Sequence, residues 1–426
     1  MPKKNYPKLR FKGFTNAWEQ RELGELMEVS SAKRVHRSEW TESGVPFLRS
    51  SDVVAAFNHK ENEKVFISQE HYDVLVAQSG KLRIGDLLVT GGGSIGVPML
   101  VKTDKPLYFK DADLIWFKNK GALNGNFLFY SFISDLVQDY IKKTAHIGTI
   151  SHYTIERGKK TPINITPLKD EQAKIGTFFE KLDSLIAANQ RKLKKTKALK
   201  SAYLSEMFPS KDENKPKLRF AGFTNAWEQR RLDAVFAPIP NNTLSRANLN
   251  YTIGKIKNVH YGDILIKYGA VTDCRRDEIP FITGGEIFDY RSQLLQEGDI
   301  LIADAAEDET VGKATEIAGI SNIPVVSGLH TIACRPKVKM QPCYLGYYMN
   351  SPSYHQQLLP LMQGIKVLSI SRTNLAKTTV FYPISEQEQS QIGRLFAGLD
   401  HLITLHQRKL EELQELKKAY LQQMFI

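Results

Sequence analysis

The chain has 426 residues, of which 42% are hydrophobic and 24% charged, and its net charge at pH 7 is +12. This length gives room for two ordinary domains, and the composition excludes a disordered or fibrous protein. A transmembrane protein is not expected, because no apolar run approaches the roughly 18 residues that span a bilayer. The charged start lacks the apolar core of a secretory leader, and the three cysteines suit neither a disulfide framework nor a zinc site. We therefore expect a cytoplasmic protein.

The positive charge is unevenly distributed. Residues 1–211 contain 34 Lys and Arg against 23 Asp and Glu, a balance of +11, whereas residues 212–426 contain 24 and 23, a balance of +1. A basic half favours a polyanionic partner, because each neutralised phosphate releases counterions. Charge alone leaves both a nucleic-acid partner and an ordinary basic surface open.

The first segment along the chain, Lys8–Leu23, occurs twice. It returns as Lys217–Leu232 with 14 of 16 positions identical. A second duplicated pair lies 217 positions apart, at Glu171–Phe208 and Glu388–Phe425, and shares Glu-Gln, Ile-Gly, Leu-Asp, Gln-Arg-Lys-Leu, Ala-Tyr-Leu and Met-Phe. The chain is therefore predicted to consist of two halves whose flanking segments repeat while their interiors differ.

The first interior is predicted to be rich in strands, with some helix around residues 125–143. Short β-branched and aromatic runs, such as Val45–Leu48 and Gly85–Val89, are bounded by turn residues. The sequence Gly91-Gly-Gly-Ser-Ile-Gly96 has the glycine spacing of a nucleotide or S-adenosylmethionine site. A strand-like run follows it instead of the helix that such a site requires. We favour a hairpin loop over a cofactor site.

A long amphipathic helix is predicted at the end of each half. Apolar residues recur there in steps of three and four, which indicates a coiled-coil seam. Asn189 in the first copy and the matching His406 in the second either fix the register of this seam or face water. The residues assigned to the seam or to a partner surface are Ile175, Leu182, Leu185, Asn189, Leu193, Tyr203, Ile392, Leu399, Leu402, His406, Leu410 and Tyr420.

A polar linker bounded by prolines at residues 209–216 separates the halves. The second interior repeats the Ile-Pro-Phe and Gly-Asp-Ile-Leu runs, with some helix around residues 342–359. We predict an α+β protein with a first strand-rich domain at 1–168, a long helix at 169–208, a second domain at 217–385 and a second long helix at 386–426.

Catalytic and metal-binding motifs are not recognisable. The chain lacks the Asn-Pro-Pro-aromatic tetrapeptide of amino-methyltransferases, the Glu-x-Lys at Glu213 lies in the linker, and its ten histidines include no H-E-x-x-H. The acidic cluster of Asp304 and Glu307–Glu309 is interpreted as a solvated turn. We expect no catalytic residue, no metal and no cofactor on this chain.

The chain resembles the specificity subunits of Type I restriction–modification systems over essentially its whole length. The resemblance is carried by the Trp-Glu-Gln-Arg segments at Trp18 and Trp227, the Ile-Pro-Phe and Gly-Asp-Ile-Leu runs, and the Glu-Gln…Ile-Gly helix starts at Glu171 and Glu388. It implies a non-catalytic protein with two target-recognition domains, each reading half of a split asymmetric site in double-stranded DNA. It also implies that the two helices pair as an antiparallel coiled coil with pseudo-twofold symmetry.

The same resemblance implies the partners. Two modification (methyltransferase) subunits dock on the helices, and nuclease–translocase subunits join through them. S-adenosylmethionine, ATP and Mg²⁺ are then bound by these partners. A different class of function remains open, a helical scaffold or architectural DNA-binding protein without base-specific readout, which methylation of one discrete bipartite sequence would distinguish.

Base edges are read by polar and basic side chains, with phosphate contacts holding the register. Loops of both interiors offer such side chains, although each is equally compatible with an ordinary surface loop. The candidate DNA-binding residues are Arg49, Ser50, Gly92, Ser94, Lys143, His146, Thr149, Lys267, Tyr268, Arg275, Arg276, Thr283 and Lys366.

Overall fold

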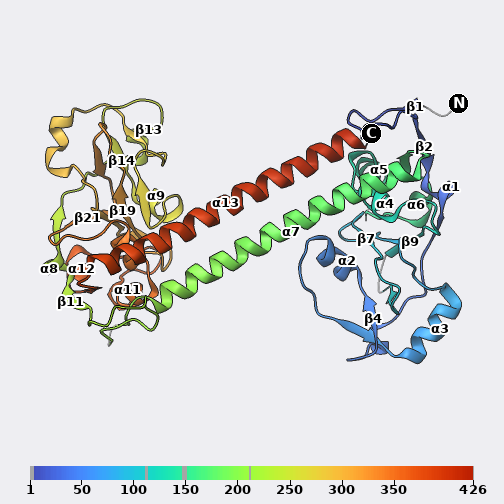
Figure 1. Ribbon diagram of the computed structural model, residues 1–426, viewed down its shortest axis with the longest axis horizontal. Coiled ribbons are helices and arrows are strands. Elements are labelled where there is room, and N and C mark those ends of the chain that lie inside the picture. Colours follow the sequence, from blue (N-terminus) through green and yellow to red (C-terminus); the bar gives the residue numbers. More distant parts are fainter. Residues whose placement is uncertain (1–3, 111–113, 146–150, 211–212, 426) are drawn as a thin grey trace. The chain divides into compact units, whose positions relative to one another are not determined.

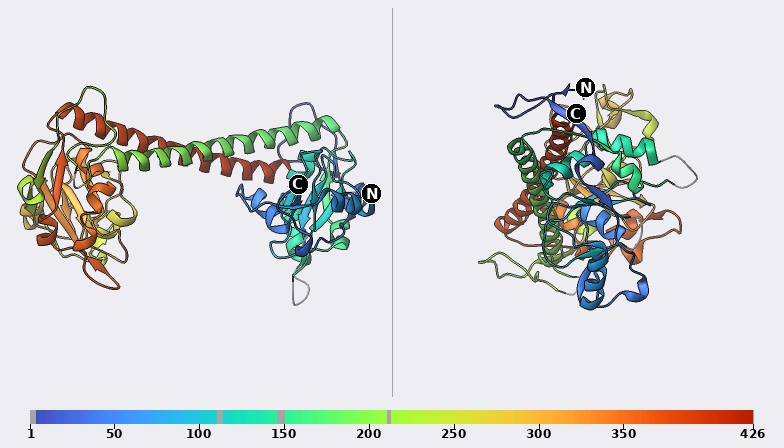
Figure 2. Two further views of the ribbon diagram at one scale, coloured as in Figure 1. Left: turned by 90° about the horizontal axis from the view of Figure 1, so that it is seen from below. Right: turned by 90° about the vertical axis from the view of Figure 1, so that its right-hand side faces the viewer.

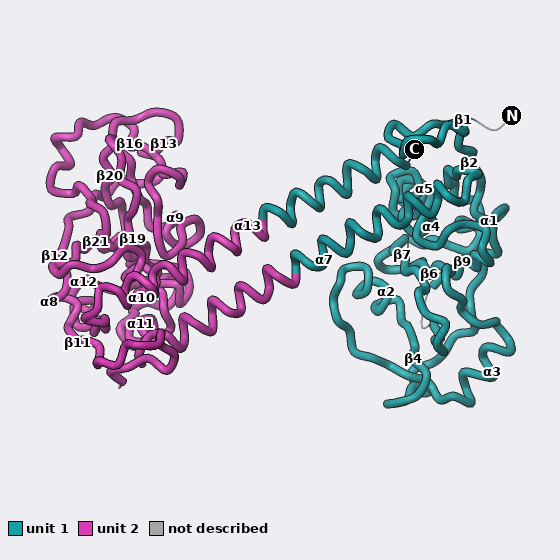
Figure 3. The backbone as a smooth tube through the Cα atoms, viewed as in Figure 1, with its two compact units in different colours: residues 1–190, 408–426 teal, residues 191–407 magenta. Residues whose placement is uncertain are grey.

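The computed structural model describes residues 4–110, 114–145, 151–210 and 213–425, which fold into two compact units (Figures 1 and 3). Unit 1 contains residues 1–190 and 408–426, and unit 2 contains residues 191–407. Helices α7 (Lys169–Glu206) and α13 (Glu386–Met424) are continuous through 38 and 39 residues, and Figure 2 shows them from two further sides. Each long helix is therefore shared between the units.

Unit 1 is a mixed α/β unit. Within its described residues, the sheets have the strand orders β3-β9-β6-β7, β5-β4-β8 and β1-β2-β10. Before α7, its elements are β1 (Lys4–Asn5), β2 (Trp18–Glu22), α1 (Leu23–Leu26), β3 (Glu28–Ser30), η1 (Arg37–Glu39), β4 (Val45–Leu48), α2 (Ser50–Phe57), β5 (Val65–Ile67), α3 (Gln69–Ser79), β6 (Leu87–Thr90), β7 (Pro98–Leu100), β8 (Tyr108–Phe109), β9 (Leu114–Lys118), α4 (Gly125–Phe132), α5 (Asp135–Ala145), α6 (Ile155–Lys159) and β10 (Pro162–Ile165).

Unit 2 repeats the main sheet with one more strand. Its described sheets have the orders β12-β21-β17-β19-β15, β13-β16-β14-β20, β11-β23 and β18-β22. Between α7 and α13, its elements are β11 (Glu228–Arg231), α8 (Leu232–Val235), β12 (Phe236–Ile239), η2 (Arg246–Asn248), β13 (Leu249–Asn250), β14 (Lys257–Val259), α9 (Tyr261–Ile266), β15 (Val271–Asp273), β16 (Phe281–Ile282), η3 (Ile287–Gln293), β17 (Ile300–Ala303), β18 (Ala305–Ala306), β19 (Ala314–Ala318), β20 (Val325–Ser327), β21 (Thr331–Pro336), α10 (Tyr344–Met349), α11 (Pro352–His355), η4 (Leu359–Leu361), β22 (Leu368–Ser369), α12 (Arg372–Ala376) and β23 (Thr379–Tyr382).

The Gly-Asp turns seen in the sequence begin the central strands β6 and β17. The carboxylate of Asp86, 2% exposed, accepts hydrogen bonds from the backbone N–H of Arg83 and Asn119 and from the indole N–H of Trp116. Asp299 holds the turn before β17 through the backbone N–H of Gln296. These buried carboxylates are tolerated because their oxygens are satisfied.

Each unit is completed by the last residues of the long helix that begins in the other unit. In unit 1, Met424 and Phe425 pack in a buried cluster with Trp18, Phe127 and Phe179. The backbone N–H of Leu9 also donates to Gln423 O at 3.0 Å. In unit 2, Met207 and Phe208 occupy the equivalent places beside Trp227 and Phe396. The repeated Met-Phe endings are therefore core residues.

Several expectations agree with this fold. The stretch Gly91–Gly96 is the turn of the β6–β7 hairpin, in which Thr90 N donates to Val97 O at 3.1 Å. The two long helices occur close to their expected bounds, and α4, α5, α10 and α11 lie in the regions where shorter helices were expected. Within the described ranges, no helix is both long and apolar enough to cross a bilayer.

Candidate nucleic-acid interface and helix surfaces

The duplicated segments meet at a buried ion pair in each unit. Arg10 Nε lies 2.5 Å from Glu171 Oε1 in unit 1, and Arg219 Nε lies 2.6 Å from Glu388 Oε1 in unit 2. Both glutamate side chains are at most 1% exposed, and each accepts a second bond from its arginine at 2.8 Å. This pair explains why the Lys-Leu-Arg-Phe and Glu-Gln sequences recur together, since a buried carboxylate requires its partner.

The glutamine of each Glu-Gln pair joins the long helix to the preceding domain. Gln172 accepts from the backbone N–H of Asn124 at 2.9 Å and donates to Thr166 O. In unit 2, Gln389 makes the same two bonds with Gln341 N and Pro383 O. The start of each helix is therefore fixed to its domain by side-chain bonds that are repeated in the two units.

A second repeated contact joins segments of the two long helices. Within unit 1, Asp183 of α7 pairs with Lys417 of α13 at 2.6 Å and accepts from the Tyr130 hydroxyl at 2.8 Å. Within unit 2, Asp400 of α13 pairs with Lys200 of α7 at 2.5 Å and accepts from Tyr347 at 2.8 Å. Burial, followed by the neighbouring aspartate, raises the pKa of each tyrosine, so both hydroxyls act as donors.

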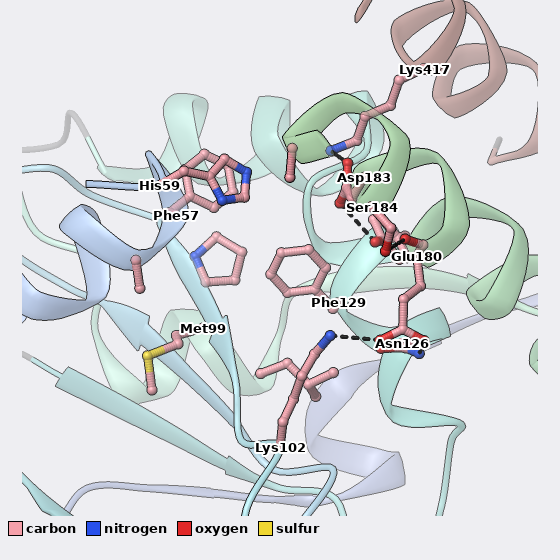
Figure 4. A pocket seen from close by; sticks show the side chains of 15 residues that line it. Phe57, His59, Met99, Lys102, Asn126, Phe129, Glu180, Asp183, Ser184 and Lys417 are labelled. Atoms are coloured by element: carbon pink, nitrogen blue, oxygen red, sulfur yellow. Dashed lines mark hydrogen bonds and ion pairs between the residues drawn. The ribbon is translucent and has the colours of Figure 1, made fainter. Parts of the chain in front are cut away.

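A cavity of about 540 Å³ lies beside this contact in unit 1 (Figure 4). Its lining combines apolar side chains such as Phe57, Met99 and Phe129 with the charged residues of α7. Lys102 lies 2.7 Å from Glu180 and lowers the pKa of that carboxyl through their hydrogen bond. Glu180 and Asp183, two carboxylates of this lining, are both engaged in ion pairs, with Lys102 and Lys417.

The DNA-binding candidates of unit 1 lie in different environments. Ser94 in the hairpin turn and Lys143 near the end of α5 are exposed, whereas Gly92 and Ser50 are partly buried and line one shallow pocket with Ser94. Arg49 is engaged internally, because its guanidinium pairs with Asp52 at 2.9 Å and also bonds Glu63 O. His146 and Thr149 lie outside the described residues.

The candidates of unit 2 also divide by exposure. The side chains of Arg275 and Arg276 are 67% and 85% exposed, and Thr283 and Lys366 are exposed as well. Lys267 is exposed but pairs with Glu278 at 2.8 Å. Tyr268 is only 3% exposed and its hydroxyl donates to Glu278 O, so the expected DNA contact of Tyr268 is wrong. Its ring belongs to a hydrophobic core, which a loop-like sequence did not reveal.

The helix residues assigned to the seam also differ in exposure. Leu182 is buried with Ile186 and Leu413, and Ile175, Ile392 and Leu399 are buried in the unit cores. Leu410 and Tyr420 pack partly buried against this Leu182 cluster, Tyr203 packs against the unit 2 core, and Leu193 is partly buried. Leu185 and Leu402, in contrast, are 53% and 45% exposed, so they lie outside the buried seam, and their alternative assignment to a partner surface stays a prediction. Ile186, next to Leu185, takes the inward position instead, where it packs with Leu182 and Leu413.

The polar residues Asn189 and His406 are both partly buried. The amide of Asn189 donates to Leu185 O of its own helix at 3.0 Å. This hydrogen bond lies within one helix and fixes no register, so that role of Asn189 and His406 stays a prediction.

Sequence reasoning missed one exposed polar pair in unit 2. His330 Nδ1 lies 3.0 Å from Asp304 Oδ1, at the start of β21 and the end of β17, next to the two-stranded sheet of β18 and β22. The two residues are 26 positions apart and belong to no motif, so the only available signal was the acidic cluster beginning at Asp304.

Comparisons with known proteins point in one direction. Residues 16–198 match the family model described as the Type I restriction modification DNA specificity domain. The chain is 26% identical over 221 residues to the MjaX type I restriction enzyme specificity subunit of Methanocaldococcus jannaschii. That match covers 50% of this chain and 49% of the relative, so the chain spans about half the length of the curated relative it matches.

Two solved structures have a similar fold. The S subunit of a Type I restriction–modification system from M. genitalium has a TM-score of 0.53 and 17% identity, over 99% of both chains. A chain from a study of complex assembly and conformational transition of a type I R-M system has a TM-score of 0.51 and 18% identity, over 95% of this chain and 96% of that chain. The resemblance seen in the sequence is confirmed. Residues 16–198 of the chain are therefore similar to the Type I restriction modification DNA specificity domain, and the fold is similar to that of a solved S subunit.

Proposed function

We propose that the chain is the specificity subunit of a Type I restriction–modification complex and that each unit reads one half of a bipartite, asymmetric DNA site. The observation that carries the proposal is the duplication. The contacts of Glu171, Gln172 and Asp183 recur at Glu388, Gln389 and Asp400, while the loops around them differ in sequence. Two equivalent frames with different loops suit two different half-sites.

We further propose that α7 and α13 pair as an antiparallel coiled coil and set the distance between the half-sites. Support comes from the Asp183–Lys417 and Asp400–Lys200 pairs, one in each unit. The residue numbers of the two pairs have the same sum, as a single antiparallel register requires. Asp183 and Asp400 occupy matching positions of the repeat, 217 residues apart, and so do Lys200 and Lys417. This exchange of matching residues between the helices is the relation expected of pseudo-twofold symmetry.

DNA contact in this proposal falls to exposed polar and basic side chains. Ser94 and Lys143 are the exposed candidates of unit 1, and Arg275, Arg276, Thr283 and Lys366 those of unit 2. Arginine and lysine suit guanine edges and phosphates, whereas threonine and serine bond either kind of group. The net charge of +12 adds sequence-independent affinity.

Two modification subunits would dock on a stripe that both long helices carry. Leu185, Lys192 and Leu199 are spaced by seven residues on α7, and Leu402, Lys409 and Leu416 repeat them on α13. The four leucines are 38–53% exposed. Exposed leucines on one helical face are typical of a partner surface, and two copies suit two identical partners. Nuclease–translocase subunits would join this cytoplasmic assembly, and S-adenosylmethionine, ATP and Mg²⁺ would be bound by the partners.

A domain exchange tests the proposal. Residues 24–166 are replaced by the matching segment of another specificity subunit, and adenine methylation is mapped across the genome of a host that expresses the chain with its modification subunits. One half-site is expected to change while the other is retained. A change in both half-sites would contradict independent readers, and methylation without any discrete motif would favour the scaffold function.

An insertion tests the spacing role of the helices. Four residues added between Lys200 and Pro216 lengthen a helix by about one turn, or roughly 5.4 Å. The unread spacer is expected to change by one or two base pairs at about 3.4 Å each, with both half-sites kept. An unchanged spacer would contradict the spacing role alone.

A further inference from the structure

A histidine–aspartate pair is held at one end of the five-stranded sheet of unit 2. Asp304 directly follows β17 and His330 directly precedes β21, and their side chains are 27% and 50% exposed. His330 Nδ1 lies 3.0 Å from Asp304 Oδ1. An exposed pair normally contributes little to stability. Its fixed geometry therefore calls for another explanation.

The backbone around this pair is fixed from three sides. Asp304 N donates to His330 O at 3.1 Å, and Ile370 N donates to Asp304 O at 2.9 Å. The Tyr261 ring packs edge-on against the His330 ring, with centroids 5.2 Å apart. His330 has a φ of +53°, a conformation that few residues other than glycine, asparagine, aspartate and histidine adopt. Such residues gather at ligand-binding sites.

The Asp304 carboxylate determines which imidazole nitrogen carries the proton. An ionised carboxylate only accepts hydrogen bonds, so Nδ1 of His330 must be the donor. In the neutral ring Nε2 then carries a lone pair and is an acceptor. Nε2 has no hydrogen-bond partner among the residues that the structure describes. The pair therefore presents a free, oriented acceptor.

The two-stranded sheet of β18 and β22, with the loop before β22, presents groups that suit a DNA groove. Strands β18 and β22 pair at Ala305–Ser369 and Ala306–Leu368, which places the loop before β22 at the same end of the sheet as Asp304. In this loop Ile365 is 100% exposed and Val367 is 55% exposed, on either side of the exposed Lys366. Apolar side chains contact thymine methyl groups and a lysine contacts phosphate or guanine.

We propose that His330 is a base-reading residue of unit 2, whose Nε2 accepts a hydrogen bond from the exocyclic amino group of adenine or cytosine. In the major groove only adenine N6 and cytosine N4 offer a donor, whereas guanine and thymine offer acceptors. Asp304 is the positioning residue that keeps Nε2 an acceptor. This inference rests on the proposed function, because it names one contact by which unit 2 reads its half-site.

The first test is His330→Asn in the chain expressed with its modification subunits. Asparagine also adopts the left-handed conformation, so the loop is preserved. His401→Asn, at an exposed position of α13 in the same unit, is the matched control. Two experiments measure the base preference. One maps methylated adenines across the genome, and the other compares binding to competing duplexes that differ at one base pair. For His330→Asn the preference at one base pair of a single half-site is expected to change by about tenfold, while the other half-site and the control stay as in the wild type.

The second test, Asp304→Asn, separates base reading from a structural role. The asparagine amide can accept from Nδ1 or donate to it, so the tautomer with a proton on Nε2 becomes available. Guanine or thymine is then expected to be tolerated at the same base pair. If both variants lower the thermal stability and the overall methylation but keep every base preference, the pair is structural and the inference is overturned. If the wild-type complex methylates no discrete DNA motif that depends on this chain, the proposed function is overturned instead.

Discussion

Glu316 illustrates how a single buried residue fixes a short helix to the main sheet of its domain. It lies in β19, is 4% exposed, and accepts backbone hydrogen bonds from Cys343 at 2.7 Å and Gly346 at 2.9 Å at the start of α10. Burial raises the pKa of its carboxyl to about 7 from an ordinary 4.5. The equivalent strand position in unit 1, judged from the pairing of β6 with β7, is Leu100, so only unit 2 contains this titrating group.

Glu316→Gln is expected to remove a pH dependence from the stability of unit 2. In the wild type the folded state keeps the proton up to about pH 7, whereas the unfolded state releases it near pH 4.5. Stability therefore falls as the pH rises through this window, by about 3 kcal/mol, and is constant above it. Urea unfolding between pH 4.5 and 8, followed by fluorescence, measures the difference. A variant with the wild-type slope would show that another group titrates.

The buried ion pair of Arg219 and Glu388 gives a second prediction. Glu388→Gln leaves the arginine, 14% exposed, without its charge partner and is expected to cost about 3 kcal/mol of unfolding free energy. The control, Glu386→Gln, disrupts the exposed pair with Lys339, and less than about 1 kcal/mol is expected. Chemical denaturation of both variants compares them. Equal losses would mean that burial does not decide the energy of these pairs.

The residue scale is where the sequence was least informative. Tyr268 looked like a loop residue but lies in a core, and the Asp304–His330 pair had no motif. Both depend on contacts between segments distant in the chain, which a local pattern does not contain. Arg275 and Arg276, in contrast, were correctly expected to be exposed, because adjacent arginines are rarely buried.

At the scale of elements, a glycine near the start of each long helix allows close packing. A Cβ at Gly176 of α7 would lie 2.8–2.9 Å from Asn124 Oδ1, Asn126 Cβ and Phe127 N. Gly393 of α13 is equally close to Pro342 O, at 2.6 Å. The shared Ile-Gly sequence therefore lies where each long helix packs against the start of a shorter helix of its domain, α4 in unit 1 and α10 in unit 2.

Gly176→Ala is expected to destabilise unit 1 by about 1–3 kcal/mol, because the added methyl group overlaps backbone and side-chain atoms of α4. Gly398→Ala is the matched control on α13. It has nothing within 4 Å of the new Cβ, and alanine is expected to stabilise the helix by about 1 kcal/mol. Thermal unfolding measures both changes. A stabilised Gly176→Ala protein would contradict the close packing.

The long helices were the most predictable elements. Their apolar spacing and lack of breakers are local properties, and the observed α7 and α13 follow them closely. The inward choice of Ile186 over Leu185 was not predictable, because it depends on the surface opposite. The β6–β7 hairpin was predictable because a strand, rather than a helix, followed the glycines.

At the scale of the whole molecule, unit 1 depends on a segment from the far end of the chain, residues 408–426, whereas unit 2 is the single stretch 191–407. Phe425 is 6% exposed and packs against Trp18, Phe127 and Phe179 with centroid distances of 5.6–6.2 Å. Phe425→Ala is expected to destabilise unit 1 by about 3 kcal/mol. Phe208→Ala is expected to do the same to unit 2. Hydrogen exchange followed by mass spectrometry shows which unit loses protection in each variant. Loss of protection in unit 2 for Phe425→Ala, or in unit 1 for Phe208→Ala, would contradict the described cores.

This interlocking also orders the synthesis of the protein. Unit 1 needs residues 408–426, which the ribosome makes only after all of residues 191–407. At 5–20 residues per second the delay is about 10–40 s. During that time the aromatic cluster of Trp18, Phe127 and Phe179 lacks its packing partner Phe425. Unit 2, in contrast, already contains Phe208. The first unit translated is therefore the last to close, and its unfinished aromatic core is the surface that a nascent-chain chaperone would be expected to bind.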